Sequence, residues 1–535
     1  MEEQLSRYRE AVDTHREGAE TDPAGHLPYL GHALSELGKA LIELERYDEA
    51  LSAFRESVDA HRQSVEMDRD PHLLGLAPAL MELGGLLDAL DRDEEAVTAW
   101  EESAALFREL AAAPEHRDDA RLPRLLDALG TVLNGLGWAL FGLGRYDGAM
   151  SALRESVDVR RGLAAADPEN FLPDLAESLN KLDAVLTELG RYGEALPVIG
   201  ESVAVHRRLA EAGSGRPTYE LALVVGELGV TLMEVGRLDE AVPLLRESAG
   251  TFDEVLAAQR DPYSPQILAI HEGKGSALSN LGLTLTKLGR LDEAATALEE
   301  AVAYYQVLVP ADPMRHLPGY ARALINLGNV RSAQDRIDDA LKVLREAVSI
   351  RQELAKADPE RFMLDFVRSM WSFSVLLLQA EQFGDAEVVA SMAAYECRTL
   401  TEVDPGRFLP ELAKVLHSLE SALVALERFE DLPAVEEEAV AIHWELIKVD
   451  RERFLPGLAR CLSNLGLTYD RLGRPGDAVP VLEKALWAHQ GLFLLRPTAH
   501  LDDWLHAFHH LAECLTKVGR HDEAARLLES RGGTA

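Results

Sequence analysis

Apolar residues recur along the whole chain at steps of three and four positions. Leu30, Leu34, Leu37 and Leu41 form one such stripe, and a second stripe follows after a short charged turn. This spacing places the apolar side chains on one face of an α-helix. The pattern therefore predicts pairs of amphipathic helices joined by short turns.

The turns recur at a nearly constant spacing. One of them is Glu45-Arg46-Tyr47-Asp48-Glu49-Ala50, and we take its final position as an anchor for counting. Successive anchors are 46 residues apart, except for two intervals of 53 residues. Seven extra residues are close to two helical turns, so the apolar face rotates by only about 20°. A period of this length predicts a solenoid of eleven repeats. The anchors are Ala50, Ala96, Ala149, Ala195, Ala241, Ala294, Ala340, Ala386, Leu432, Ala478 and Ala524.

Proline and small residues mark the helix ends and crossings. Pro28 and its equivalents are expected in the first turn of the first helix, and Asp-Pro pairs such as Asp167-Pro168 are expected to close the second helix. Leu-Gly pairs such as Leu37-Gly38 supply a small residue where the two helices cross. Leu37, Gly38, Ala50, Phe54 and Ser57, with their equivalents, are therefore predicted to be buried.

One repeat breaks this pattern. Glu436 occupies an apolar position of the ninth repeat, so we predict a locally weak point there.

These features together resemble the tetratricopeptide repeat, over about residues 25 to 530. The usual unit has 34 residues, whereas this one has 46, which is similar to long-helix variants in bacterial regulatory and signalling proteins. The resemblance implies an all-α right-handed superhelix whose first helices line a concave groove for peptides or partner helices. It implies no catalysis and no substrate, and we expect no cofactor.

The two ends complete the predicted organisation. Residues 1–24 are expected to form a capping helix, residues 25–530 the eleven repeats, and residues 531–535 a flexible tail. The alternative is that the chain is a repeat region derived from a larger architecture.

Composition restricts the partners. The formal charge of −37 disfavours nucleic acid, because it repels phosphate backbones. We expect no membrane-spanning segment and no secretory signal, and the three cysteines are expected to be reduced, so a cytoplasmic location follows.

Candidate chemistry is sparse. No phosphate-binding loop or catalytic motif is found, and the protein is not expected to be an enzyme. His506, His510 and Cys514 share one predicted helix face, but the first and last lie about 12 Å apart along the axis. At most two could bind one ion, so we expect no metal site and interpret them as polar residues of a terminal repeat.

A basic ladder is the first candidate binding surface. Arg322, Arg368, Lys414 and Arg460 are each 46 residues apart, with His506 next, and are expected to face the groove. They could bind an acidic segment or a terminal carboxylate. The alternative is local pairing, because Asp365, Glu411 and Asp503 lie three residues before Arg368, Lys414 and His506.

Apolar positions of the first helices are the second candidate. Trp138, Phe141, Met233, Trp371 and Leu378 are predicted to line the same groove, where they could bind an amphipathic helix. The alternative is that they pack between repeats.

The favoured function is a scaffold or adaptor that binds an acidic or amphipathic protein segment in the groove. A regulatory sensor for a small apolar or anionic ligand is the alternative.

Overall fold

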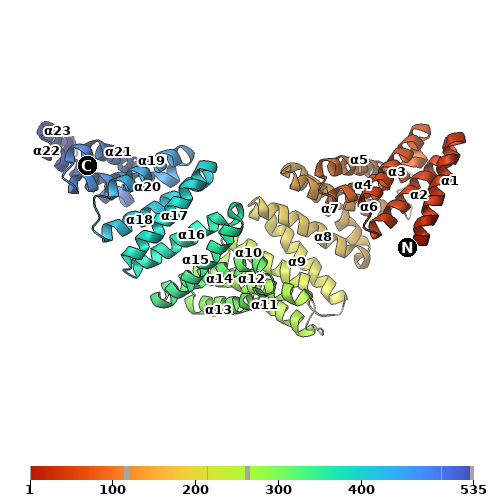
Figure 1. Ribbon diagram of the computed structural model, residues 1–535, viewed down its shortest axis with the longest axis horizontal. Coiled ribbons are helices and arrows are strands. Elements are labelled where there is room, and N and C mark those ends of the chain that lie inside the picture. The colour runs from red at the N-terminus through yellow and green to blue at the C-terminus, as the bar shows by residue number, and fades with distance from the viewer. Residues whose placement is uncertain (1, 114–120, 214, 260–264, 496, 531–535) are drawn as a thin grey trace. The chain divides into compact units, whose positions relative to one another are not determined.

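The computed structural model describes residues 2–113, 121–213, 215–259, 265–495 and 497–530 (Figure 1). These residues form 23 α-helices and no strand. The chain divides into two compact units, Met1–Gly273 (unit 1) and Lys274–Ala535 (unit 2), and helix α12 (Pro265–Lys287) crosses the boundary. The predicted all-α repeat solenoid is confirmed. The predicted tail, residues 531–535, lies outside the described residues.

Unit 1 begins with α1 (Glu2–Thr21), which packs on α2. Helix pairs then follow, and each helix packs on the next along the chain (Figure 1). These are α2 (Pro23–Glu43) with α3 (Tyr47–Met67), α4 (Arg69–Ala89) with α5 (Asp93–Ala112), α6 (Leu122–Gly142) with α7 (Tyr146–Ala166), α8 (Pro168–Glu188) with α9 (Tyr192–Ala212), and α10 (Tyr219–Glu234) with α11 (Leu238–Ala258).

Unit 2 continues the same scheme, with α12 followed by α13 (Leu291–Leu308). The remaining pairs are α14 (Pro313–Ala333) with α15 (Ile337–Ala357), α16 (Pro359–Gln379) with α17 (Phe383–Val403), α18 (Pro405–Ala425) with α19 (Leu432–Val449), α20 (Arg451–Arg471) with α21 (Pro475–Leu495), and α22 (Pro497–Lys517) with α23 (His521–Ser530). Counting α12 with α13, the described residues contain the eleven expected pairs.

The first helices begin earlier than the proline pattern predicted. The Asp-Pro pairs start the first helix: Pro168 is its first residue, and the Asp167 side chain accepts a hydrogen bond from the backbone N–H of Asn170. Pro173 and Pro28, expected in the first turn, lie inside their helices. The reason is that aspartate at the N-cap and proline at the next position stabilise the helix start together.

Every first helix ends in a left-handed residue five positions before the anchor. Glycine occupies this position in six repeats, for example Gly144 (φ 71°), whereas Glu45 (φ 59°) and four other acidic residues occupy it in the rest. In the first repeat, the Arg46 N–H donates to Leu41 O and the Glu45 N–H donates to Ile42 O. This pair of bonds is a Schellman cap, which fixes the sharp turn into the second helix.

Small residues allow the two helices of a repeat to cross closely, as predicted. A Cβ atom on Gly38 would lie 2.6 Å from the Phe54 ring, and one on Gly137 would lie 2.6 Å from Leu153. Ala50, Phe54 and Ser57 are at most 1% exposed, and Leu37 is 9% exposed. The predicted burial of this set is confirmed in the first repeat.

A second set of close contacts was not predicted. In five repeats, a large side chain eleven positions after the anchor lies against a glycine of one or both neighbouring first helices. His61 lies against Gly31 and Gly75, and Tyr305 lies against Gly275 and Gly319. Histidine and arginine at these positions are therefore buried by the packing of the repeats.

Among the described residues, one helix is long and apolar enough to be a candidate membrane span. This helix is α6, Leu122–Gly142. It packs between α5 and α7 as a repeat helix, and 56% of its apolar window is buried. Its apolar character is accounted for by its contacts within unit 1.

Candidate functional site

The second helices of unit 1 carry a ladder of ion pairs that the sequence analysis missed. Arg16 of α1 binds Glu56 of α3 at 2.7 Å, and Arg161 of α7 binds Glu201 of α9 at 2.8 Å. Because the partners are 40 residues apart, a search at the repeat length minus six would have found them. The other pairs with this spacing in unit 1 are Arg55–Glu95, Arg62–Glu102, Arg154–Glu194 and Arg207–Glu247 on second helices, together with Arg9–Glu49 from α1 and Arg69–Glu109 from the start of α4.

The basic ladder on the first helices of unit 2 has a different arrangement. Arg368 of α16 donates to Glu411 of α18 at 2.8 Å, and Lys414 of α18 reaches the other oxygen of Glu411 at 3.0 Å. Burial alone would raise the pKa of Glu411, but these two hydrogen bonds outweigh it and hold the pKa below its ordinary value. Two cations that are each about half exposed thus share one carboxylate.

The ladder continues on α20, where the arginine has no carboxylate partner among the residues that the structure describes. Arg460 contacts the ring nitrogens of His417 on α18. His417 lies 3.4 Å from Glu420, which also accepts a hydrogen bond from Asn464 of α20. Side chains therefore connect α16, α18 and α20 in one surface. The exposed Arg322 of α14 has no hydrogen bond or ion pair within the described residues.

The alternative of local pairing is only partly realised. Lys414 pairs with Glu411 three residues earlier, as that alternative expected. Asp365, however, lies 3.4 Å from Arg351 of the preceding second helix, and Asp503 lies 3.9 Å from His500.

The apolar candidates divide into three kinds. Trp138 is 42% exposed and its ring lies 5.6 Å from that of Phe141. Trp371 is partly buried and lies beneath the Lys414 ammonium, 5.6 Å from the ring centre, which joins it to the basic ladder. Leu378 is partly buried against the core of its repeats.

Met233 corrects the prediction of an exposed apolar residue, because it is only 5% exposed. It lies in the last turn of α10, the shortest first helix. Its unbranched side chain can turn into the interior, where a rigid ring such as that of Phe141 stays partly exposed.

A cleft of about 710 Å³ adjoins the C-terminal end of the basic ladder. It is lined by residues of α20, α21 and α22, including Arg460, Leu467, His489 and His506. Leu467 is 51% exposed. The cleft therefore offers both a cation and an apolar surface to a ligand.

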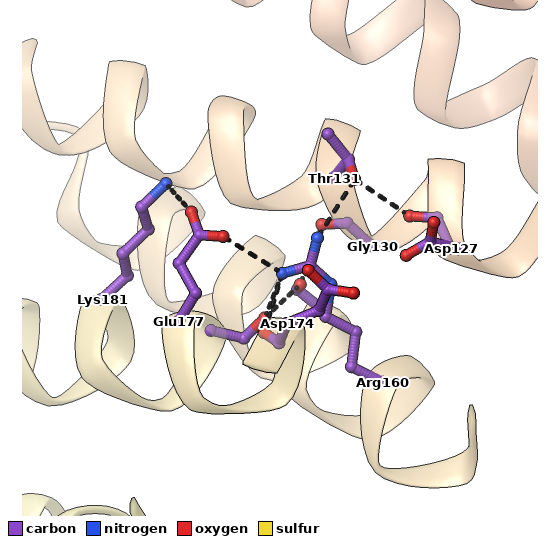
Figure 2. Close-up of polar contacts among 9 residues, drawn as sticks. Asp127, Gly130, Thr131, Arg160, Asp174, Glu177 and Lys181 are labelled. Atoms are coloured by element: carbon purple, nitrogen blue, oxygen red, sulfur yellow. Dashed lines mark hydrogen bonds and ion pairs between the residues drawn. The ribbon is translucent and has the colours of Figure 1, made fainter. Parts of the chain in front are cut away.

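A buried arginine in unit 1 has a structural role. Figure 2 shows Arg160 of α7 reaching between α6 and α8, where it donates to Asp174 O at 2.8 Å, Ser178 Oγ at 3.1 Å and Thr131 Oγ1 at 3.1 Å. Glu177 lies 3.7 Å away and is itself held by Lys181 at 2.9 Å. With both terminal nitrogens engaged and only 2% exposure, Arg160 links two first helices and is closed to ligands.

Glu436 is the counterpart of Arg160 in unit 2, as an ionisable group in the interior. It is 2% exposed, and Thr468 donates to one of its oxygens at 3.0 Å while the other has no partner within the described residues. Burial raises the pKa of Glu436 to about 8. Its ninth repeat is thus held by an incomplete polar contact at a position where Phe54 and Leu153 are buried.

Five segments match sequence models described as tetratricopeptide repeat: residues 30–72, 129–167, 279–359, 458–489 and 505–530. No curated protein sequence matches significantly.

Similar solved structures include BtubC (BKLC) from P. vanneervenii, with 17% identity and a TM-score of 0.37, covering 49% of this chain and 95% of that one. The apo form of RapI has 11% identity and a TM-score of 0.37, with 66% and 98% covered. A STAND signal transduction ATPase with a tetratricopeptide repeat sensor, from Pyrococcus horikoshii, has 12% identity and a TM-score of 0.46, with 84% and 54% covered. The repeat matches, the eleven helix pairs and their glycine crossings together show that the chain is a tetratricopeptide repeat protein.

Proposed function

We propose that the protein is a non-catalytic scaffold that binds an acidic, amphipathic protein segment along α16, α18 and α20. Repeats of this family support protein interaction or sensing in general terms. The observation that carries the more specific proposal is the surplus of positive charge on this surface, within a chain of formal charge −37.

The surplus follows from the contacts. Arg368 and Lys414 share Glu411, and Arg460 contacts His417 rather than a carboxylate. A carboxylate of a partner would gain charge-assisted hydrogen bonds here without breaking a complete ion pair. The local positive potential would also steer an acidic segment toward this surface.

Apolar side chains beside the cations favour an amphipathic partner. Trp371 lies beneath Lys414, and Val424 and Leu467 are 44% and 51% exposed on α18 and α20. An amphipathic helix could cover these side chains and place its carboxylates on the cations, which is a common mode of helix binding.

The test is fluorescence anisotropy with a labelled amphipathic helix of Leu and Glu, and with a matched helix of Leu and Lys. The Arg368→Glu/Arg460→Glu double variant should weaken binding of the acidic helix by at least about tenfold, since charge-assisted hydrogen bonds are replaced by repulsion.

The matched control is Arg161→Glu/Arg398→Glu, which reverses two arginines that pair with Glu201 and Glu438 on second helices. Equal weakening by both double variants, or equal binding of both helices by the unmodified protein, would reject the proposal.

The cleft next to Arg460 supports a second candidate, a sensor for a small anionic ligand. Its volume of about 710 Å³ lies within the range of small-molecule sites. Binding of free acetate or succinate without any binding of the acidic helix would favour this candidate over the scaffold.

A further inference from the structure

Three metal-binding side chains converge beside the C-terminal cleft. Asp470 is on α20, while His510 and Cys514 are one helical turn apart on α22. Ligand atoms of all three lie within 4.8 Å of one another. The sequence analysis considered His506, His510 and Cys514, and it missed Asp470 because that residue is 40 positions earlier and on another helix.

The distances suit one small ion. Ligand atoms on one tetrahedral zinc ion, at about 2.0 to 2.3 Å from it, lie about 3.3 to 3.8 Å apart. His510 Nε2 and Asp470 Oδ2 are 3.5 Å apart. This nitrogen is buried and has no hydrogen bond of normal geometry within the described residues, although it faces the Asp470 carboxylate.

From this geometry we infer that Asp470, His510 and Cys514 bind a Zn²⁺ ion that ties α20 to α22. Carboxylate, imidazole and thiolate are all zinc ligands. Cys514 loses its proton to solvent when it ligates the ion. The fourth position is left for water, which the adjoining cleft can supply, because Asp470 and His510 line it.

Lys517 competes with the ion for Asp470. Its ammonium lies 2.6 Å from Asp470 Oδ2, but its side chain is 49% exposed and can move into solvent. Removal of this cation should therefore tighten metal binding, an effect that adventitious binding to surface histidines would not show.

The ninth and tenth repeats provide a matched control. Cys461 Sγ lies 3.8 Å from His443 Nδ1, but no third ligand joins them among the described residues. Two ligands do not make a stable zinc site. Cys461 and His443 therefore provide, in the same protein, a cysteine–histidine pair without the third ligand.

The experiment is titration of the full, untagged chain with Zn²⁺ against a chromogenic chelator, with Co²⁺ as a spectroscopic probe. We expect one tight ion per chain and a thiolate-to-cobalt charge-transfer band. His510→Ala, Cys514→Ser and Asp470→Asn should each weaken binding by at least about tenfold, Cys514→Ser should also remove the band, and Lys517→Met should strengthen binding.

Cys461→Ala and His521→Ala should leave both readouts unchanged, and circular dichroism in chelator verifies that each variant is folded. Binding that is weak, that has no charge-transfer band, or that Cys514→Ser and Cys461→Ala affect equally would overturn the inference. Absence of any effect of Lys517→Met would overturn the assignment of Asp470.

Discussion

The second helices of unit 1 and the first helices of unit 2 use the same charged residue types differently. On the second helices, arginines such as Arg62 and Arg161 each have a carboxylate partner on the next second helix. On α16, α18 and α20, two cations share Glu411 and Arg460 contacts a histidine. Regular spacing of charges is thus common to a structural surface and a candidate binding surface, and incomplete pairing distinguishes them.

The same contrast holds in the interior. Arg160 has hydrogen-bond partners on both terminal nitrogens and lacks one only at Nε, whereas Glu436 has a partner on just one of its two oxygens within the described residues. More fully paired networks should stabilise the fold, and less fully paired ones should weaken it or leave groups available to a ligand.

The largest effect is expected at Arg160. The Arg160→Met variant should lower the local free energy of unfolding by about 3 kcal/mol, because buried acceptors on α6 and α8 lose their donor. Native-state hydrogen exchange of α6 and α8 measures this. The neighbouring Arg161→Met should change it by less than about 1 kcal/mol, because its pair with Glu201 is exposed. Equal losses of stability in the Arg160→Met and Arg161→Met variants would contradict the distinction between the buried network and the exposed ion pair.

A gain in stability is expected at Glu436. The Glu436→Leu variant should raise the free energy of unfolding by about 1 to 3 kcal/mol, because leucine restores the apolar side chain found at Leu153 and Leu344. In the unmodified protein, amides of α19 should exchange faster than those of α17 and α21. A destabilised leucine variant would show that the contact with Thr468 is worth more than the burial.

The stability of the repeat that contains Glu436 should also depend on pH. Because the pKa of Glu436 is raised from 4.5 to about 8, the folded protein holds a proton there that the unfolded chain has lost. Its stability should fall as pH rises from about 4.5 to 8. Glu436→Gln should reduce this slope in α19, as measured by hydrogen exchange across that range. Asp183, with a pKa raised to about 7, should contribute a similar slope in unit 1 that the variant leaves intact.

The smallest effect is expected on the ion-pair ladder. Arg62→Gln should change stability by at most about 1 kcal/mol, because the pair with Glu102 is exposed on both sides. The change should shrink further in high salt. A larger loss, measured by thermal unfolding at low and high salt, would mean that the ladder acts as a cooperative network.

Much of the fold could be predicted because the sequence features that define a repeat lie within that repeat. The anchor turn and the apolar stripe are local and recur in all eleven repeats, a Leu-Gly pair recurs in seven of them, and together they fix the period. The start of the first helices was misplaced, because an aspartate-proline pair both ends one helix and caps the next. Acidic residues such as Glu45 in the left-handed position also concealed that all eleven turns are alike.

The candidate sites were harder to predict because their contacts cross repeats. Arg368 was expected to pair with Asp365 if it paired locally, yet it reaches Glu411 on the next first helix. Met233 was placed with Phe141 by spacing alone, and burial separates them. Periodicity predicts which helix face carries a residue. The side-chain rotamer and the neighbouring helices determine which partner the residue contacts.

The central claim is that the incompletely paired surface of α16, α18 and α20 holds a partner segment. Hydrogen exchange of the protein with and without the acidic amphipathic helix tests it most directly. The account predicts slower exchange in α16, α18 and α20, unchanged exchange in α17 and α19, and loss of this footprint in the Arg368→Glu/Arg460→Glu variant. Protection of the second helices, or of no helix at saturating peptide, would contradict it.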